Sequence, residues 1–153
     1  HTASLMPENK ARYLMGVGPP KDLLIRIGHG VDQFDCVMPS RTGRHGKAFT
    51  HDGGLYIKNK FNHFDDRPLD PSCSCAVCAQ FSRSYIRHLW MLDEALGKQL
   101  MVHHNLAFYL QLSRKARKAI LEDRYGDFQK EWLARMASGR WRHLPPGPPD
   151  LSA

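Results

Sequence analysis

Three cysteines crowded into a short segment are the sharpest chemical signal in the sequence. Cys73, Cys75 and Cys78 follow a Cys-x-Cys-x-x-Cys pattern, and three thiolates at this spacing can converge on one ion from a single tight loop. Zinc takes four nitrogen or sulfur ligands in a tetrahedron, so the fourth ligand must come from elsewhere in the chain. Buried structural cysteines and a redox cluster are the competing interpretations, whereas a disulfide framework is typical of smaller secreted chains.

Four residues are candidates for the fourth ligand: His88, His103, His104 and Cys36. We favour His104, because we expect it near the start of a helix that packs against the helix after Cys78. Its neighbour His103 would point in another direction and lie at the surface or beside the site. Three sulfur ligands and one nitrogen leave no open position on the ion, so the predicted site is structural and holds together a segment with little core of its own.

Two aspartates near the end of an apolar run are candidates for carboxylate chemistry. Asp32 and Asp35 belong to residues 31–38, an expected strand that Pro39 would stop. Alternation along a strand would put the two carboxylates on opposite faces. A carboxylate suits attack on a carbon that develops positive charge, because it can stabilise that charge and then bond to it. By residue type the two are equal candidates, and a structural role for both remains open.

The segments around these aspartates predict a strand, a helix and a second strand. Residues 12–18 form an apolar run that ends in glycines, and Pro20 can then open a helix with Asp22 in its first turn. Such a unit is normally parallel and right-handed, as in an α/β barrel or layered sheet. Two lone parallel strands would leave edges and faces uncovered, so we expect them to belong to a larger sheet.

The remaining segments are predicted from turn residues and helical spacing. Residues 40–50 read as a flexible basic loop whose end, Lys47–Thr50, pairs with Leu55–Lys58 around Asp52-Gly53-Gly54 in a hairpin. Residues 59–72 are irregular. Helical spacing then predicts three helices. The first lies around residues 81–89 and is stopped by Gly97, the second covers about 105–123, and the third covers 128–136.

Composition limits the class of protein. The chain has 153 residues with 42% apolar and 24% charged side chains, which fits one globular domain. No early segment reads as a signal peptide and no apolar run is long enough to cross a membrane, so we expect no membrane and a cytoplasmic setting. The net charge of +7 favours a polyanionic partner, nucleic acid first, although a solvated basic surface is the plainer alternative.

Read together, these motifs resemble the tRNA-guanine transglycosylases (queuine tRNA-ribosyltransferases) of bacterial type, in their C-terminal portion. The likeness rests on residues 13–18, residues 30–44, the cysteine cluster and His104-Asn105, and covers roughly residues 10–136. The resemblance implies an α/β fold, the C-terminal part of a (β/α)8 TIM barrel with a zinc-binding insertion. The implied divisions are 1–38 for the last two barrel strands and their helix, 39–103 for the hairpin and zinc insertion, 104–136 for the C-terminal helices, and 137–153 for a proline-rich disordered tail.

The resemblance also implies an activity and a role for each matching residue. The family exchanges the wobble guanine of tRNA for a 7-deazaguanine queuosine precursor through a covalent aspartyl-ribosyl intermediate. Asp35 matches the nucleophile and Met15 a residue packed against the base, although a methionine in the core is the plainer alternative. The positions that match RNA contacts are Gly16, Val17, Gly18, Pro19, Pro20, Lys21 and Asp22, and then Ser40, Arg41, Thr42, Gly43 and Arg44; two solvated loop arginines are the alternative there.

The implied partners follow from the same resemblance. They are one structural Zn²⁺, tRNA with a wobble guanine, 7-aminomethyl-7-deazaguanine or a related base, and a second copy in a homodimer. No position matches the family's acid/base aspartate or its guanine-reading aspartate, so the chain alone is expected to be inactive. The alternative function is a non-enzymatic, zinc-stabilised RNA-binding module. A protein-interaction zinc module is weaker, because it does not explain the strand-helix-strand segment.

Overall fold

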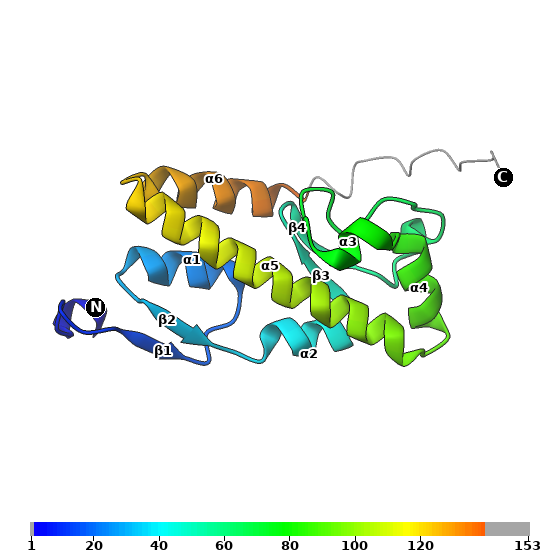
Figure 1. The fold of residues 1–153 in the computed structure, drawn as a ribbon, viewed down its shortest axis with the longest axis horizontal. Helices are drawn as coiled ribbons and strands as arrows, with labels where there is room; N and C mark the ends of the chain where they lie inside the picture. The colour runs from blue at the N-terminus through cyan, green and yellow to red at the C-terminus, as the bar shows by residue number, and fades with distance from the viewer. Residues whose placement is uncertain (1, 140–153) are drawn as a thin grey trace.

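The structure is a computed structural model that describes residues 2–139. One long helix, α5 (Ala95–Leu121), forms its axis, and the other elements lie along it (Figure 1). A short 3-10 helix, η1 (Thr2–Leu5), precedes the first strand. The prediction of a disordered tail concerns residues that lie almost wholly outside the described range.

The predicted strand-helix-strand unit is present and parallel. Strands β1 (Tyr13–Met15) and β2 (Gln33–Asp35) pair in parallel, with Met15 opposite Asp35. Both strands are three residues long, shorter than expected. Helix α1 (Pro20–Gly28) connects them and begins at the predicted proline, which the first turn of a helix accepts because its missing N–H has no partner there.

The prediction of a flexible loop after the second strand is wrong. Residues 38–44 form helix α2 (Met38–Arg44), and Pro39 lies in its first turn instead of stopping a strand. Gly43 lets this helix approach α5 closely, since a Cβ there would lie 2.9 Å from the backbone nitrogen of Val102. A tertiary contact therefore stabilises a helix that the Ser, Thr, Gly and Arg content disfavours.

The hairpin is present, but its turn is displaced. Strands β3 (Lys47–Thr50) and β4 (Gly53–Tyr56) are antiparallel with Thr50 opposite Gly53, so the turn is His51-Asp52 and not Asp52-Gly53-Gly54. Apart from a 3-10 turn, η2 (Lys60–Asn62), the chain up to the cysteines is irregular, as predicted.

Four helices complete the described chain: α3 (Ala76–Gln80), α4 (Arg83–Met91), α5 and α6 (Tyr125–Ser138). The predicted stop at Gly97 is wrong, because the chain turns at Asp93, which has a φ of 59°, and Gly97 lies inside α5. There it allows close contact with Leu89 and Trp90. Helix α5 starts ten residues before the predicted position, so His104 lies in its interior and the boundary at 103/104 falls within it.

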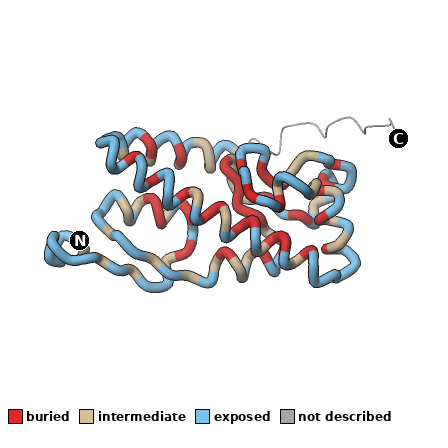
Figure 2. Tube along the Cα trace, viewed as in Figure 1, coloured by how far each residue is buried: buried red, intermediate tan, exposed pale blue. Residues whose placement is uncertain are grey.

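Burial is concentrated along α5 and is low on the parallel strands (Figure 2). One core cluster lies under the hairpin and cysteine loop, and a second lies between α1, α5 and α6. Tyr13 and Met15 of β1 are 50% and 74% exposed, which is unusual for parallel strands. The strands in residues 2–139 form two separate two-stranded sheets, and this mixed α/β arrangement contains no barrel. None of the described helices combines the length and apolar character that crossing a membrane requires.

Candidate functional site

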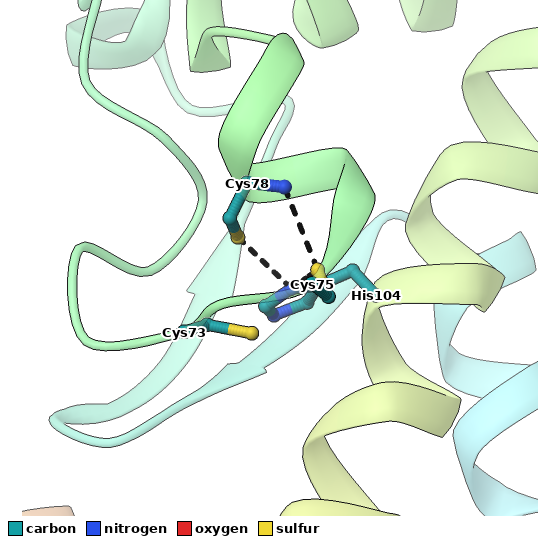
Figure 3. A group of neighbouring side chains, drawn as sticks. All are labelled: Cys73, Cys75, Cys78 and His104. Atoms are coloured by element: carbon teal, nitrogen blue, oxygen red, sulfur yellow. Dashed lines mark hydrogen bonds between the residues drawn. The ribbon is translucent and has the colours of Figure 1, made fainter.

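Cys73, Cys75, Cys78 and His104 converge from the cysteine loop and α5 (Figure 3), and their ligand atoms lie within 4.8 Å of one another. His104 Nδ1 is 3.7 Å from Cys75 Sγ and 3.3 Å from Cys78 Sγ. In a tetrahedral zinc site, bond lengths of about 2.3 and 2.0 Å give sulfur–nitrogen separations of about 3.5 Å. The four side chains therefore form a tetrad that can bind one metal ion.

The other candidates for the fourth ligand lie elsewhere. His88 and His103 are exposed, as expected for His103, and Cys36 lines a cavity beside Asp35. His104 is thus the histidine that joins the three cysteines in the described residues.

Local structure explains how the cysteines converge. Cys75 caps the N-terminus of α3, where its Sγ accepts a hydrogen bond from the Cys78 backbone N–H, and Cys78 follows within the first turn. The Sγ atoms of Cys75 and Cys78 therefore both point toward Nδ1 of His104. Cys73 Sγ accepts a hydrogen bond from Gln111 Nε2 of α5 at 3.7 Å. Such N–H donors stabilise the thiolate forms that bind metals.

The orientation of His104 is set by the hairpin. Its Nε2 donates to the carbonyl oxygen of Phe49 at 2.8 Å, which leaves Nδ1 directed at the sulfurs. The next residue, Asn105, accepts from the Phe49 N–H and donates to the carbonyls of Pro39 and Lys47. Two consecutive side chains of α5 thus bond both backbone groups of Phe49. Sequence reasoning gave Asn105 no role, although it stands directly after the predicted ligand.

The electrostatics of the tetrad favour a central cation. Burial lowers the pKa of His104, but hydrogen bonds with Cys73 and Cys75 outweigh burial and raise it to about 9. Hydrogen bonds with Cys73 and Cys78 lower the pKa of Cys75, whereas hydrogen bonds with Cys73 and Cys75 raise the pKa of Cys78. The cluster therefore carries one thiolate readily and resists a second unless a positive charge stands between them.

Asp35 lies at the C-terminal end of β2 with an exposed side chain. Its Oδ1 accepts hydrogen bonds from the Tyr13 hydroxyl at 2.5 Å and from the Gly16 amide at 3.2 Å. The Tyr13 hydroxyl first, and then the Gly16 amide, holds the pKa of Asp35 below its usual value. Asp32 is engaged differently, because its Oδ2 accepts from the Arg12 backbone N–H at 2.8 Å and ties the start of one strand to the other.

A cavity of about 510 Å³ opens beside Asp35, between the turn after β1 and helix α2. Among the predicted RNA-contact positions, Gly16, Gly18, Arg41 and Thr42 line it. Tyr109 of α5 holds this turn, since its hydroxyl donates to the Gly18 carbonyl at 2.6 Å. The predicted positions outside this lining are Met15, Val17, Pro19, Pro20, Lys21, Asp22, Ser40, Gly43 and Arg44.

These features define an α/β protein with a buried tetrad that could bind one metal ion and a parallel strand pair that ends in an exposed carboxylate. Residues 1–138 match the sequence model of a family described as queuine tRNA-ribosyltransferase, and the chain belongs to this family. The resemblance found in the motifs is thereby confirmed.

Individual relatives agree with the family match. The chain is 50% identical over 134 residues to the queuine tRNA-ribosyltransferase of Herpetosiphon aurantiacus and 52% identical over 134 residues to that of Francisella tularensis subsp. novicida. Each match covers 88% of this chain but 34% and 36% of the relatives, so the chain spans about a third of their length. The matching part is their C-terminal portion.

Proposed function

We propose that this chain is the part of a tRNA-guanine transglycosylase that carries the nucleophile and the zinc site, with Asp35 as the nucleophile. The carboxylate forms a bond to C1′ of the ribose while the bond from C1′ to guanine breaks. Guanine leaves with the electron pair and takes a proton from a carboxylic acid outside these 153 residues. An incoming deazaguanine, in the family 7-aminomethyl-7-deazaguanine, then displaces the aspartyl ester and gives up its proton to the same group.

The observation that carries the proposal is the state of Asp35. Its carboxylate is exposed, held in the ionised form by two donors, and located where a parallel strand ends. Active sites of β/α barrels lie at the C-terminal ends of their strands. Asp32, the rival on sequence, already accepts a backbone hydrogen bond that joins the two strands.

A tRNA partner is supported by the residues around this carboxylate. Arg41 lines the neighbouring cavity, and Arg44 and Lys21 are exposed. Arginine forks suit phosphates and the base edges of an unstacked anticodon loop, and the target nucleotide must leave its stack to be reached. Met15, 74% exposed at the end of β1, is free to pack against a base. A tRNA substrate would place the protein in the cytoplasm.

We further propose that β1 and β2 are the last two strands of a (β/α)8 barrel, with residues 39–103 as the insertion and 104–136 as the closing helices. The support is the exposure of the first and last residues of both parallel strands, since such strands are normally buried. Helix α5 crosses residue 104, so in the complete enzyme its first part would belong to the insertion and its second part to the closing helices. A homodimer is proposed from the resemblance alone.

Zinc is the proposed metal, since three sulfurs and one nitrogen are a typical structural zinc set. When bound, it would supply four bonds that cross-link the cysteine loop to α5, with no open position for a reactant. The residues that hold it are Cys73, Cys75, Cys78 and His104, and Phe49 orients the histidine.

The test is intact mass spectrometry after mixing protein with an anticodon stem-loop RNA and quenching under denaturing conditions. We expect no adduct with the 153-residue chain alone, because the acid and guanine-reading groups are not assigned to it. A joined protein is then made, in which this chain follows the N-terminal two thirds of the Herpetosiphon relative. The mass of this joined protein should increase by the mass of the RNA minus guanine.

Asp35→Asn should abolish that adduct, and Asp32→Asn is the matched control that should retain it. An adduct that survives Asp35→Asn would reject Asp35 as the nucleophile. Tight tRNA binding without any adduct in the joined protein would instead favour the second candidate, a zinc-stabilised RNA-binding module, which exposed Arg44 and Lys21 also support.

A further inference from the structure

The two oxygens of the Asp35 carboxylate stand in different surroundings. Both donors that reach it, the Tyr13 hydroxyl at 2.5 Å and the Gly16 amide at 3.2 Å, bond to Oδ1. Within residues 2–139 no other residue donates a hydrogen bond to Oδ2. The carboxylate is therefore restricted in rotation, with one oxygen bound by two donors from other residues and one oxygen that no other residue contacts in this way.

The strand register explains why Tyr13 reaches this carboxylate. Met15 lies opposite Asp35, and Tyr13, two residues earlier, projects from the same face of the pair. Two residues of strand span about 6.6 Å, a distance that a tyrosine side chain can cover. Gly16 completes the arrangement: its N–H donates to Oδ1 of Asp35, and its φ of +72°, a conformation that favours glycine, turns the chain after β1.

We infer that Tyr13 is a positioning residue that, together with the Gly16 amide, assigns Oδ2 of Asp35 as the attacking oxygen and Oδ1 as the oxygen that stabilises charge. This inference rests on the proposed function. In the first step Oδ2 bonds to C1′ as guanine departs with the electron pair and a proton from the external carboxylic acid. Oδ1 then becomes the carbonyl oxygen of the ester and keeps its two donors.

These donors act in opposite directions on the two half-reactions. They lower the pKa of Asp35, which makes the carboxylate a weaker base but a better leaving group when the incoming base attacks C1′. The same contact raises the pKa of Tyr13, so its hydroxyl remains a donor through the neutral range. Removal of the hydroxyl should therefore slow release of the ester more than its formation.

The test uses Tyr13→Phe in the joined protein described above, with each half-reaction measured separately. We expect discharge of the adduct by the incoming base to slow about tenfold, in line with the loss of a hydrogen bond to a charged group. The acidic limb of adduct formation should move to higher pH, because the Asp35 pKa returns toward its ordinary value. The dissociation constant for RNA should not change.

Tyr56→Phe is the matched control, since Tyr56 lies on the hairpin strand β4 and the residue is 47% exposed. One metal per chain and an unchanged circular dichroism spectrum would show that Tyr13→Phe folds. An adduct in the parent whose discharge rate and pH profile are the same in Tyr13→Phe would overturn the inference and leave the proposed function intact. No adduct in the parent would overturn the proposed function, and the inference with it.

Discussion

Two of the four cysteines, Cys78 and Cys36, are similarly half-buried, yet only Cys78 belongs to the metal tetrad. The ligand set could be predicted, because spacing alone brings three thiols together on one loop. The partners that orient the site could not. Tyr13 depends on the register of two strands for its contact with Asp35, and Asn105 bonds backbone groups more than fifty residues away.

At the scale of single residues, we predict that Cys78→Ser lowers metal affinity by more than about a hundredfold. Replacing a residue that only hydrogen-bonds a ligand already lowers metal affinity by about 10–100-fold, and Cys78 is itself a candidate ligand. Competition with a chelator, followed by metal analysis of the protein, measures the effect. Cys36→Ser is the control and should keep one metal per chain. Equal loss of metal in both variants would mean that the tetrad is not the binding site.

Among the elements, α2 illustrates what local sequence misses. Its composition is typical of a loop, but Gly43 packs on the α5 backbone, and Asn105 bonds one carbonyl in the first turn of α2, that of Pro39, and one after the helix, that of Lys47. The predicted start of α5 is likewise too late in the sequence. Gly97 is typical of a helix stop, but in the structure it allows a close contact between α5 and α4. By contrast α1 and α6 follow from local signals, a proline at the start of one and an apolar face on the other.

Gly43→Ala should therefore push α2 away from α5 and lower the free energy of unfolding by about 1–3 kcal/mol, a typical cost of overpacking. Arg41 would shift with the helix, so RNA binding should weaken as well. Urea unfolding and RNA titration measure the two effects. Gly126→Ala in α6 is the matched control: a Cβ there meets nothing within 4 Å, so it should be neutral or stabilising by about 0.5–1 kcal/mol. Similar midpoints for the two variants would refute the close-packing role of Gly43.

Across the whole molecule, buried carboxylates that bond arginine and histidine side chains hold the irregular segment between the hairpin and the cysteines. Asp65 bonds Arg67 and the buried Arg83, and Asp70 bonds the buried His51. Burial raises the pKa of each carboxyl, but these partners outweigh burial and lower both below the ordinary value. The parallel pairing of β1 and β2 could be predicted because a helix connects the two strands. The bonds of Asp65 and Asp70 could not, because the residues that they join form no recognisable sequence pattern.

A lowered carboxyl pKa contributes stability that is present above the unfolded pKa of about 3.9 and is lost as the pH falls through the folded value. Asp65→Asn should thus cost about 3–5 kcal/mol at pH 6, because it leaves Arg83 buried without its charge partner. Urea unfolding at several pH values should show the gap to the parent narrowing below about pH 4. Exposed Asp127→Asn should leave the pH dependence unchanged. A gap for Asp65→Asn that is constant from pH 6 to pH 3 would contradict the assignment.

The bonds from His104 and Asn105 to Phe49 also have a consequence for the order of synthesis. They join positions 55 and 56 residues apart. A ribosome making about 5–20 residues per second therefore delivers Phe49 roughly 3–11 s, and Cys78 roughly 1–5 s, before His104. During that interval the thiolates can hold an ion with one position still open. Docking of the newly made helix would then supply the fourth ligand, His104, and fix the hairpin in the same event, so that an ion captured early would be enclosed last.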